Sequence, residues 1–248
     1  MKTITCGNYE VIIGKNSIKS FNYTCYSKIA ILVDENTKKN CLEKFLQEVR
    51  FLKNYFVIEI SEGEQNKTIH TCSYIWDKLI EYEFDKNSLF VNLGGGLVSD
   101  IGGYCATNYK RGIDFINIPT TLLAMVDASI GGKLAVNHNN LKNQIGLFKN
   151  PVKVLINCYF LKTLSIQQIN SGYAEIIKHT LISNKDAWKN LKKNDLNNII
   201  WETIIYNSIS IKNNIVLQDP YENNLRKILN FGHTFAHAIE SYYLERNN

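Results

Sequence analysis

Two clusters of ionisable side chains in the second half of the chain have spacings suited to a metal or substrate site. In the first cluster, Glu175, Lys178 and His179 are separated by three and four residues, so a helix would carry all three on one face. Glutamate and histidine are ligands of catalytic zinc and similar divalent ions, which take three protein ligands and keep one position open. This cluster therefore offers a carboxylate and an imidazole for metal chemistry.

The second cluster lies on residues 224–243, whose periodicity predicts a helix. Its polar side chains step by four, three and four residues and form one stripe, made of Arg226, Asn230, His233 and His237. The exposed face of an amphipathic helix would also explain this stripe. The H-x-x-x-H spacing occurs in zinc proteases, but Thr234 stands where that motif requires a general-base glutamate, so the protease class is excluded.

A glycine-rich turn, Gly94–Gly96, follows a strand-like run and precedes a helical stretch. Glycine lets a backbone approach a pyrophosphate closely, and a helix N-terminus adds free N–H groups with partial positive charge. The turn lacks the G-x-G-x-x-G fingerprint, and a tight turn without a ligand is the alternative. Two other strand-like runs end in Asp34 and in Glu64 with Lys67, which favours a nucleotide site, because open α/β sheets bind ligands at the carboxyl ends of their strands.

A second glycine turn, Gly131-Gly132, leads into Lys133 and is followed by Lys142 and Asn143. Lysines and an asparagine around such a turn suit a phosphate-bearing substrate. A solvated surface charge is the alternative for any lysine in a loop.

The elements that must position these residues fall into two classes. Up to about residue 157, strand-like runs rich in Ile, Val and Phe alternate with stretches of helical spacing, which predicts a doubly wound parallel sheet. The strand-like runs are 29–33, 55–60, 89–93, 115–118 and 152–156, and the helical stretches are 41–52, 69–82 and 98–107. Beyond residue 160 only helical spacing remains, at 165–183, 185–191, 197–217 and 224–243. We expect a Rossmann-like α/β domain over 1–160 and an all-helical metal- and substrate-binding domain over 161–248, with the site in the cleft between them.

The composition is that of an ordinary soluble globular protein. The 248 residues are 45% hydrophobic and 21% charged, and the net charge of +5 includes no run of basic residues that would indicate a nucleic-acid arm. No stretch approaches the ~20 apolar residues of a membrane span, and the N-terminus lacks the apolar run of a signal peptide. The six cysteines are scattered, which indicates reduced thiols. We therefore expect a cytoplasmic protein with neither a membrane nor a nucleic-acid partner.

Seven segments taken together resemble 3-dehydroquinate synthase, a family of the sugar-phosphate cyclase superfamily. They occur in order between about residues 30 and 240 and comprise Gly94–Asp100, Arg111–Ile116, Ile118–Leu123, Val126–Lys133, Lys142–Asn143, Ser171–Lys178 and Asn230–Glu240. The resemblance implies an NAD- and metal-dependent carbon–oxygen lyase that converts 3-deoxy-D-arabino-heptulosonate 7-phosphate (DAHP) to 3-dehydroquinate and phosphate in the shikimate pathway. In this reaction bound NAD transiently oxidises a ring hydroxyl, phosphate is eliminated, the hydroxyl is restored, and an intramolecular aldol step closes the carbocycle.

The resemblance also implies roles for individual residues. The implied NAD contacts are Asp34, Asn36, Glu64, Lys67, Gly95, Gly96, Asp100, Thr120, Thr121, Lys142, Phe160 and Thr163. The implied substrate contacts are Asp127, Lys133, Asn143, Lys178, Lys212, Arg226 and Asn230, together with Arg111, which the family lends to the partner subunit's site in a homodimer. Glu175 and His233 are implied as ligands of Zn²⁺ or Co²⁺. Glu222 and His237 are implied as proton-transfer residues, in a catalytic set with Lys133, Arg226 and Asn230.

The resemblance breaks down at the C-terminal end. In the family, a histidine that is the third metal ligand comes after the position that corresponds to Asn248, the last residue of this sequence. Because two ligands hold a divalent ion poorly, and because the helices missing there would leave apolar surface uncovered, we expect this polypeptide to be inactive or barely active alone.

Three alternatives differ in what they would show in solution. Sister cyclases that make 2-deoxy-scyllo-inosose or valiolone share the glycine turn and the Glu–His pair, but Arg226 with Asn230 and the 131–133 segment favour the dehydroquinate version. A metal-dependent polyol dehydrogenase would produce NADH from alcohols. A non-catalytic remnant would bind NAD without metal binding or turnover.

Overall fold

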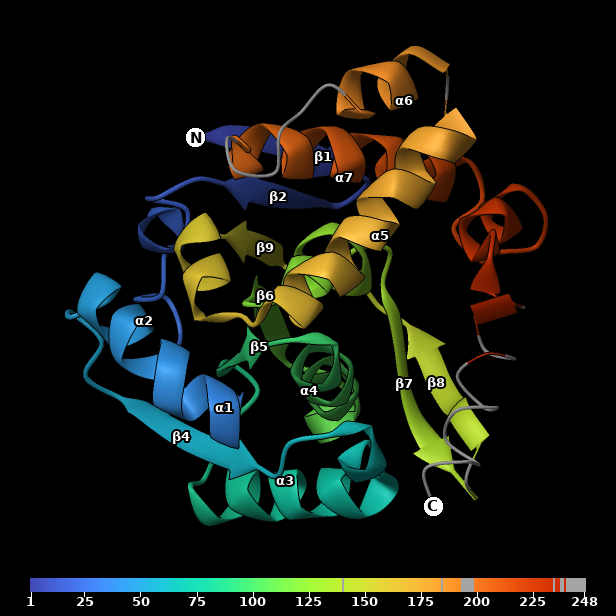
Figure 1. Ribbon diagram of the computed structural model, residues 1–248. Helices are drawn as coiled ribbons and strands as arrows, with labels where there is room; N and C mark the ends of the chain where they lie inside the picture. The colour runs from blue at the N-terminus through green and yellow to red at the C-terminus, as the bar shows by residue number, and fades with distance from the viewer. Residues whose placement is uncertain (140, 184, 193–198, 234, 237–238, 240–248) are drawn as a thin grey trace.

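A mostly parallel seven-stranded sheet forms the centre of the molecule (Figure 1). The computed structural model describes residues 1–139, 141–183, 185–192, 199–233, 235–236 and 239. In spatial order the strands are β1 (Lys2–Cys6), β2 (Tyr9–Ile13), β9 (Lys153–Ile156), β6 (Asp114–Pro119), β5 (Leu89–Gly94), β3 (Ile29–Asp34) and β4 (Tyr55–Ile60). Only the β1–β2 pair within this sheet is antiparallel.

The five strands predicted from apolar runs are confirmed as β3, β4, β5, β6 and β9. Every residue of β5 is buried, and β3 and β6 are buried over most of their length, because helices cover both faces of a parallel sheet and favour nearly continuous apolar runs. Side chains of β3 alternate between two core clusters. Ile29, Ile31 and Val33 pack on one side of the sheet, and Ala30 and Leu32 pack on the other.

The helices of the first part lie close to their predicted positions. The stretch predicted at 41–52 is a composite of α1 (Glu35–Thr37), a π-helical turn (Lys38–Leu42) and α2 (Glu43–Glu48). The other two are α3 (Ile69–Glu81) and α4 (Gly96–Asn108). Short helical turns occur at Ile18–Ser20, Glu64–Asn66, Tyr109–Arg111, Ala124–Ala128 and Cys158–Thr163.

The described part of the chain after Leu164 is helical, as predicted. It contains α5 (Ile166–Ser183), α6 (Lys185–Lys192) and α7 (Trp201–Gln218). In no described segment is a helix both long enough and apolar enough to cross a membrane.

The prediction of one helix over 224–243 is wrong in its first part. A 3₁₀ helix spans Leu225–Asn230, and helical backbone resumes only at His233. Gly232 lies between them with a φ of +85°, a left-handed conformation that interrupts a right-handed helix. The polar stripe is therefore divided, and Arg226 lies in the interior rather than on a wet face.

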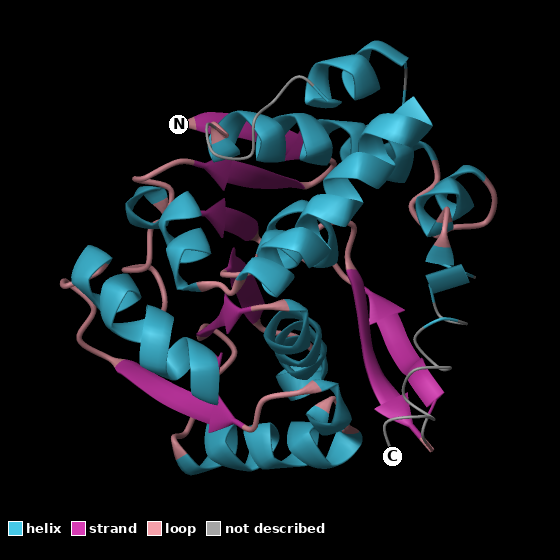
Figure 2. Cartoon of the chain, in the orientation of Figure 1, coloured by secondary structure: helices cyan, strands magenta, loops and turns pink. Residues whose placement is uncertain are grey.

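Two hairpins were not predicted. The segment carrying Lys133, Lys142 and Asn143, interpreted as a loop, contains β7 (Lys133–His138) and β8 (Leu141–Phe148). These two strands form a separate two-stranded sheet (Figure 2). In β7, Leu134 and Val136 alternate with more exposed residues, but so short an alternation is a weak signal.

The hairpin β1–β2 extends the main sheet through β9 and also reaches the helical part. Asn213 of α7 donates to the carbonyl of Thr5 at 3.0 Å, and the ammonium of Lys2 donates to Thr203 at the same distance. The first residues of the chain therefore tie the sheet to α7.

Candidate active site

A cavity of about 720 Å³ collects most of the predicted substrate residues. Its walls come from the β7–β8 hairpin, the N-terminal half of α4, α5, α7 and the segment 222–233. The predicted residues that line it are Asp100, Asp127, Lys133, Asn143, Lys178, Lys212, Glu222, Arg226, Asn230 and His233. Among the predicted substrate contacts, Arg111 alone lies elsewhere.

Two lysines that line this cavity are each held in an ion pair. The ammonium of Lys212, on α7, lies 2.6 Å from Asp127 Oδ1 and 2.7 Å from the Asp127 carbonyl oxygen. Lys178 pairs with Glu175 one turn away on α5. Burial by itself would raise the pKa of Asp127, but Lys212 and Lys178 outweigh it and hold that pKa below its usual value. Asp127 is therefore a carboxylate at neutral pH.

Glu175 and His233 face each other, as the proposed metal site requires. Glu175 Oε1 and His233 Nε2 are 3.8 Å apart. Two ligands bound at about 2.1 Å to one tetrahedral zinc ion lie about 3.4 Å apart, so the pair fits a shared divalent cation after a small adjustment. Oxygen and imidazole nitrogen are also the donor types that zinc and cobalt accept.

A second group of possible ligand atoms lies on the other side of Glu175. Asp127, Glu175 and His179 each bring one ligand atom within 4.8 Å of the others. The ammonium groups of Lys212 and Lys178 already occupy the carboxylates on this side, so it is charge-balanced without a metal. We therefore favour the His233 side for a cation.

His179 is a site residue to which the resemblance assigned no role, although its spacing placed its imidazole on the same helix face as Glu175. Its Nδ1 lies 2.7 Å from Ser208 Oγ, and its Nε2 has no hydrogen-bond partner among the described residues. Burial lowers the pKa of His179 to about 3, so the imidazole is neutral at pH 7. Nε2 points between Asp127 Oδ1 at 3.9 Å and Glu175 Oε2 at 4.0 Å.

Glu222 lines the cavity and has a left-handed backbone (φ +60°). Its carboxylate pairs with Lys133 and accepts a hydrogen bond from Asn230 Nδ2 at 2.8 Å. Partial burial would raise the pKa of Glu222, but the Lys133 and Asn230 contacts lower it below its usual value. His237, the other predicted proton-transfer residue, lies outside the described residues.

Arg226 is almost completely buried, and its guanidinium is held by backbone carbonyls. Nη1 donates to the Pro220 carbonyl at 2.5 Å, and Nη2 donates to the Gly131 carbonyl at 2.9 Å. The Arg226 N–H donates to the Asp219 carboxylate, whose two oxygens accept three backbone N–H groups in all. The guanidinium is thus fixed in place before any ligand arrives.

The glycine turn has the geometry of a phosphate cradle. Gly95 is the N-cap of α4 and provides no side-chain cap, which leaves the first N–H groups of the helix available. Gly94 is paired with Pro119, so the end of β6 lies beside the turn. A methyl group added at Gly95 would lie 3.1 Å from Thr121 Cγ2, and Thr120 donates its N–H to the Gly94 carbonyl at 3.0 Å. Gly95, Thr120 and Thr121, all predicted to contact the cofactor, therefore lie together at this turn.

Lys67 connects the predicted cofactor and substrate residues. Its buried ammonium lies 2.5 Å from Asp100 Oδ2 and 2.7 Å from Asn143 Oδ1. Burial raises the pKa of Asp100 to about 6, with the Lys67 ammonium acting in the opposite direction. Glu64 lies beside them and accepts a hydrogen bond from Asn137 at 3.0 Å.

A third group of predicted cofactor residues gathers around Cys41, which the sequence did not indicate. Thr163 and Thr120 contact its thiol, and burial raises the pKa of that thiol to about 11. Asp34 lies nearby but caps its own helix, accepting the Thr37 N–H at 2.7 Å.

The remaining predicted cofactor residues lie apart from these groups, each in a different environment. Asn36 donates to Glu62, Phe160 is fully buried, and Lys142 lies exposed at the start of β8.

Arg111 lies in a different region, beside a cavity of about 400 Å³ that is also lined by Tyr26, Lys86 and Asp114. Lys110, Arg111 and Gly112 have positive φ values of 48°, 63° and 99°, a rare run of left-handed residues. The ammonium of Lys86 contacts the carbonyl oxygens of all three. The Arg111 side chain is thus presented on the surface by a strained loop.

Solved structures with the same architecture include sugar-phosphate cyclases. A 2-deoxy-scyllo-inosose synthase, solved with carbaglucose-6-phosphate, NAD⁺ and Co²⁺, has a TM-score of 0.87 and 25% sequence identity, over 97% of this chain and 70% of that one. The fold and the site therefore define a protein of the sugar-phosphate cyclase class.

Sequence comparisons identify the family within this class. The model described as 3-dehydroquinate synthase N-terminal matches residues 57–171, and the one described as 3-dehydroquinate synthase C-terminal matches 172–247. The 3-dehydroquinate synthase of Parabacteroides distasonis is 42% identical over 87% of this chain, which spans 62% of that protein's length. The enzyme from Prochlorococcus marinus strain SARG is 40% identical, over 94% of this chain and 68% of its own length. The chain belongs to the 3-dehydroquinate synthase family.

Proposed function

We propose that the protein converts DAHP to 3-dehydroquinate and phosphate. The observation that carries the proposal is the convergence of Lys133, Lys178, Lys212 and Arg226 on one cavity. His233 also lines this cavity, and Glu175 lies 3.8 Å from His233. Four cations suit a substrate with both a carboxylate and a phosphate. Two relatives that are 42% and 40% identical to this chain are named 3-dehydroquinate synthase, which supports the proposal.

The residues present fit both cofactors that the resemblance implies. The uncapped N-terminus of α4 and the glycines before it suit a pyrophosphate, and Glu175 with His233 suits a divalent cation. When bound, NAD supplies a reversible hydride acceptor, and Zn²⁺ or Co²⁺ supplies a Lewis acid for the reacting hydroxyl. The 2-deoxy-scyllo-inosose synthase was solved with NAD⁺ and Co²⁺.

The chain's own residues would act mainly by binding and orientation. Arg226 is fixed by backbone carbonyls and Lys212 by Asp127, so these two cations meet the substrate without reorganisation. Lys133 is paired with Glu222, and its half-exposed side chain can exchange this carboxylate for a substrate anion. Glu222 would then have an ionised carboxylate available to accept a proton.

We further propose the assembly, domains and location that the sequence led us to expect. Arg111 would reach the active site of a partner subunit in a homodimer, which its distance from the main cavity of its own chain supports. The proposed division is 1–160 for NAD binding and 161–248 for the metal and substrate. The six free cysteines support a cytoplasmic location.

The test is an assay of phosphate release on the protein expressed from its complete coding sequence. With DAHP, NAD⁺ and Zn²⁺ we expect phosphate release with no net NADH. Glu175→Gln should abolish the reaction and weaken Zn²⁺ binding, whereas Glu59→Gln, on the distant edge strand β4, should change neither. Activity on glucose 6-phosphate alone would favour the 2-deoxy-scyllo-inosose reaction, and NADH accumulation from polyols would favour a dehydrogenase.

A further inference from the structure

The turn Gly131-Gly132 connects two residues of the substrate cavity, Asp127 and Lys133. Both glycines have left-handed backbones, with φ values of +97° and +67°. The Gly132 carbonyl accepts the N–H of Lys149 at 2.8 Å, and the Gly131 carbonyl accepts Arg226 Nη2. The position of this turn therefore determines where the ammonium of Lys133 and the guanidinium of Arg226 can lie.

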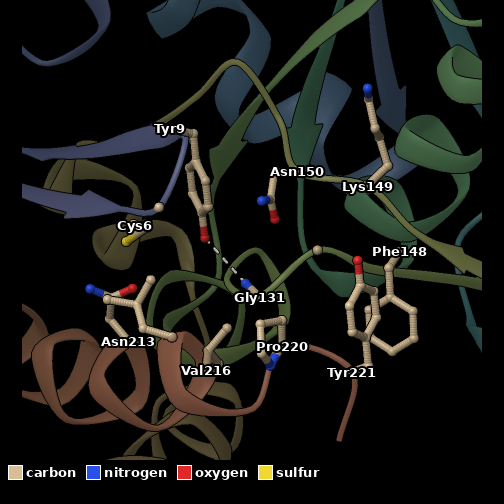
Figure 3. Close-up of a pocket in the computed structure, with 13 residues that line it drawn as sticks. Cys6, Tyr9, Gly131, Phe148, Lys149, Asn150, Asn213, Val216, Pro220 and Tyr221 are labelled. Carbon is tan, nitrogen blue, oxygen red and sulfur yellow. Dashed lines mark hydrogen bonds between the residues drawn. The ribbon is translucent and has the colours of Figure 1, made fainter.

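Tyr9, on β2, holds the same turn from the opposite side. Its hydroxyl accepts the N–H of Gly131 at 3.2 Å (Figure 3), and its side chain is buried. Both backbone polar groups of Gly131 are therefore hydrogen-bonded to side chains: the N–H donates to Tyr9, and the carbonyl accepts from Arg226. A methyl group added at Gly131 would lie 2.5 Å from Arg226 Nη2, so the backbone and the guanidinium are in direct contact.

A second cavity borders the turn on the side of Tyr9. Its volume is about 200 Å³, and it is lined by Tyr9, the two glycines, Phe148 and Tyr221 among others (Figure 3). Because side chains do not fill this space, hydrogen bonds restrain the turn there: the Gly131 N–H to Tyr9, and the Lys149 N–H to the Gly132 carbonyl. Of these two, the bond to Tyr9 is the one made by a side chain. Tyr9 is not among the residues that line the larger cavity.

We propose that Tyr9 is a positioning residue of the substrate site, which acts through Gly131 on Arg226 and Lys133. The proposal rests on the proposed function for the roles of those two cations. Tyr9 precedes the segment matched by the family models, and no sequence motif indicated it. Its contribution arises because β2 joins the main sheet beside β9 and thereby faces the turn.

Tyr9→Phe tests the proposal because it removes only the hydroxyl. Tyr23→Phe is the matched control, since Tyr23 is equally buried in the same core cluster and its hydroxyl has no hydrogen-bond partner among the described residues. Hydrogen–deuterium exchange of residues 129–134 should become about tenfold faster in Tyr9→Phe, because the Gly131 N–H loses its acceptor. It should not change in Tyr23→Phe. Equal exchange in the two variants would overturn the proposal.

Kinetics with DAHP provide the second readout. We expect Tyr9→Phe to raise KM about tenfold with kcat altered less than about twofold, because uniform binding is lost. Added to Arg226→Lys, the same change should raise KM less than about twofold further, since both act through one contact. Additive effects, or a loss of stability with unchanged KM, would overturn the proposal. These kinetics use the protein from its complete coding sequence, as in the phosphate-release assay. An inactive wild type there would reject the proposed function alone, because the exchange comparison does not depend on turnover.

Discussion

Replacing Lys212 by methionine would isolate one buried charge in the site. Methionine keeps most of the length of the side chain and removes the ammonium that lies 2.6 Å from Asp127 Oδ1. The side chain of Lys212 is 6% exposed and that of Asp127 is 30% exposed. The substitution therefore leaves a largely buried carboxylate with its main counter-charge removed.

The size of the effect follows from what remains around Asp127. Removing one partner of a buried ion pair costs about 3–5 kcal/mol, because the other charge stays desolvated. Lys178 still acts on Asp127 from a greater distance, so we expect about 3 kcal/mol, at the lower end of that range. Asp127→Asn in the same background removes the stranded charge and should restore part of the lost stability.

The assay is unfolding in denaturant at pH 7 and pH 5 for the wild type, Lys212→Met and the double variant. Loss of Lys212 removes the largest influence that lowers the pKa of Asp127, so burial should raise that pKa. A raised carboxyl pKa adds stability at low pH that is lost as the pH rises through it. Lys212→Met should therefore lose less stability at pH 5 than at pH 7. A loss under about 1 kcal/mol at both pH values would show that water solvates Asp127 and would refute the reasoning.

Three further predictions concern other parts of the structure. Burial lowers the pKa of His179 from 6.5 to about 3. On acidification, His179 is therefore protonated in the unfolded chain before it is protonated in the folded protein. Relative to His179→Gln, the wild type should therefore lose up to about 1.4 kcal/mol per pH unit below pH 6.5 in metal-free unfolding experiments, and parallel curves would contradict this. Gly102→Ala should destabilise by about 1–3 kcal/mol despite the better helix propensity of alanine, because the methyl group would collide with Asn92 and Leu32; a rise in Tm would refute the packing argument. Lys86→Met should speed proteolysis at residues 109–113, because the carbonyls of the left-handed segment lose their ammonium, and unchanged cleavage would count against that role.

The sequence predicted five of the seven strands of the main sheet, β3, β4, β5, β6 and β9, because their signals are local. An apolar run such as 89–93 is buried on both faces in any parallel sheet, so its assignment as a strand needs no knowledge of its neighbours. The hairpin β7–β8 has only a short alternation, and its register depends on packing against α4 that the sequence does not display. The break at Gly232 was missed because helical periodicity continues across it.

The same distinction applies to the site: local spacing predicted some of its residues, and long-range contacts determine the others. Spacing along α5 placed Glu175, Lys178 and His179 on one face, and the resemblance supplied most of the residues around the cavity. Only the folded chain brings His233 to 3.8 Å from Glu175, from a segment 58 positions later, and sets Tyr9 against Gly131 across 122 positions. Residue type and periodicity fix which groups are available, because they follow from neighbours along the chain. Which of those groups meet depends on how the β1–β2 hairpin, α5 and α7 pack, and that packing is a property of the whole fold.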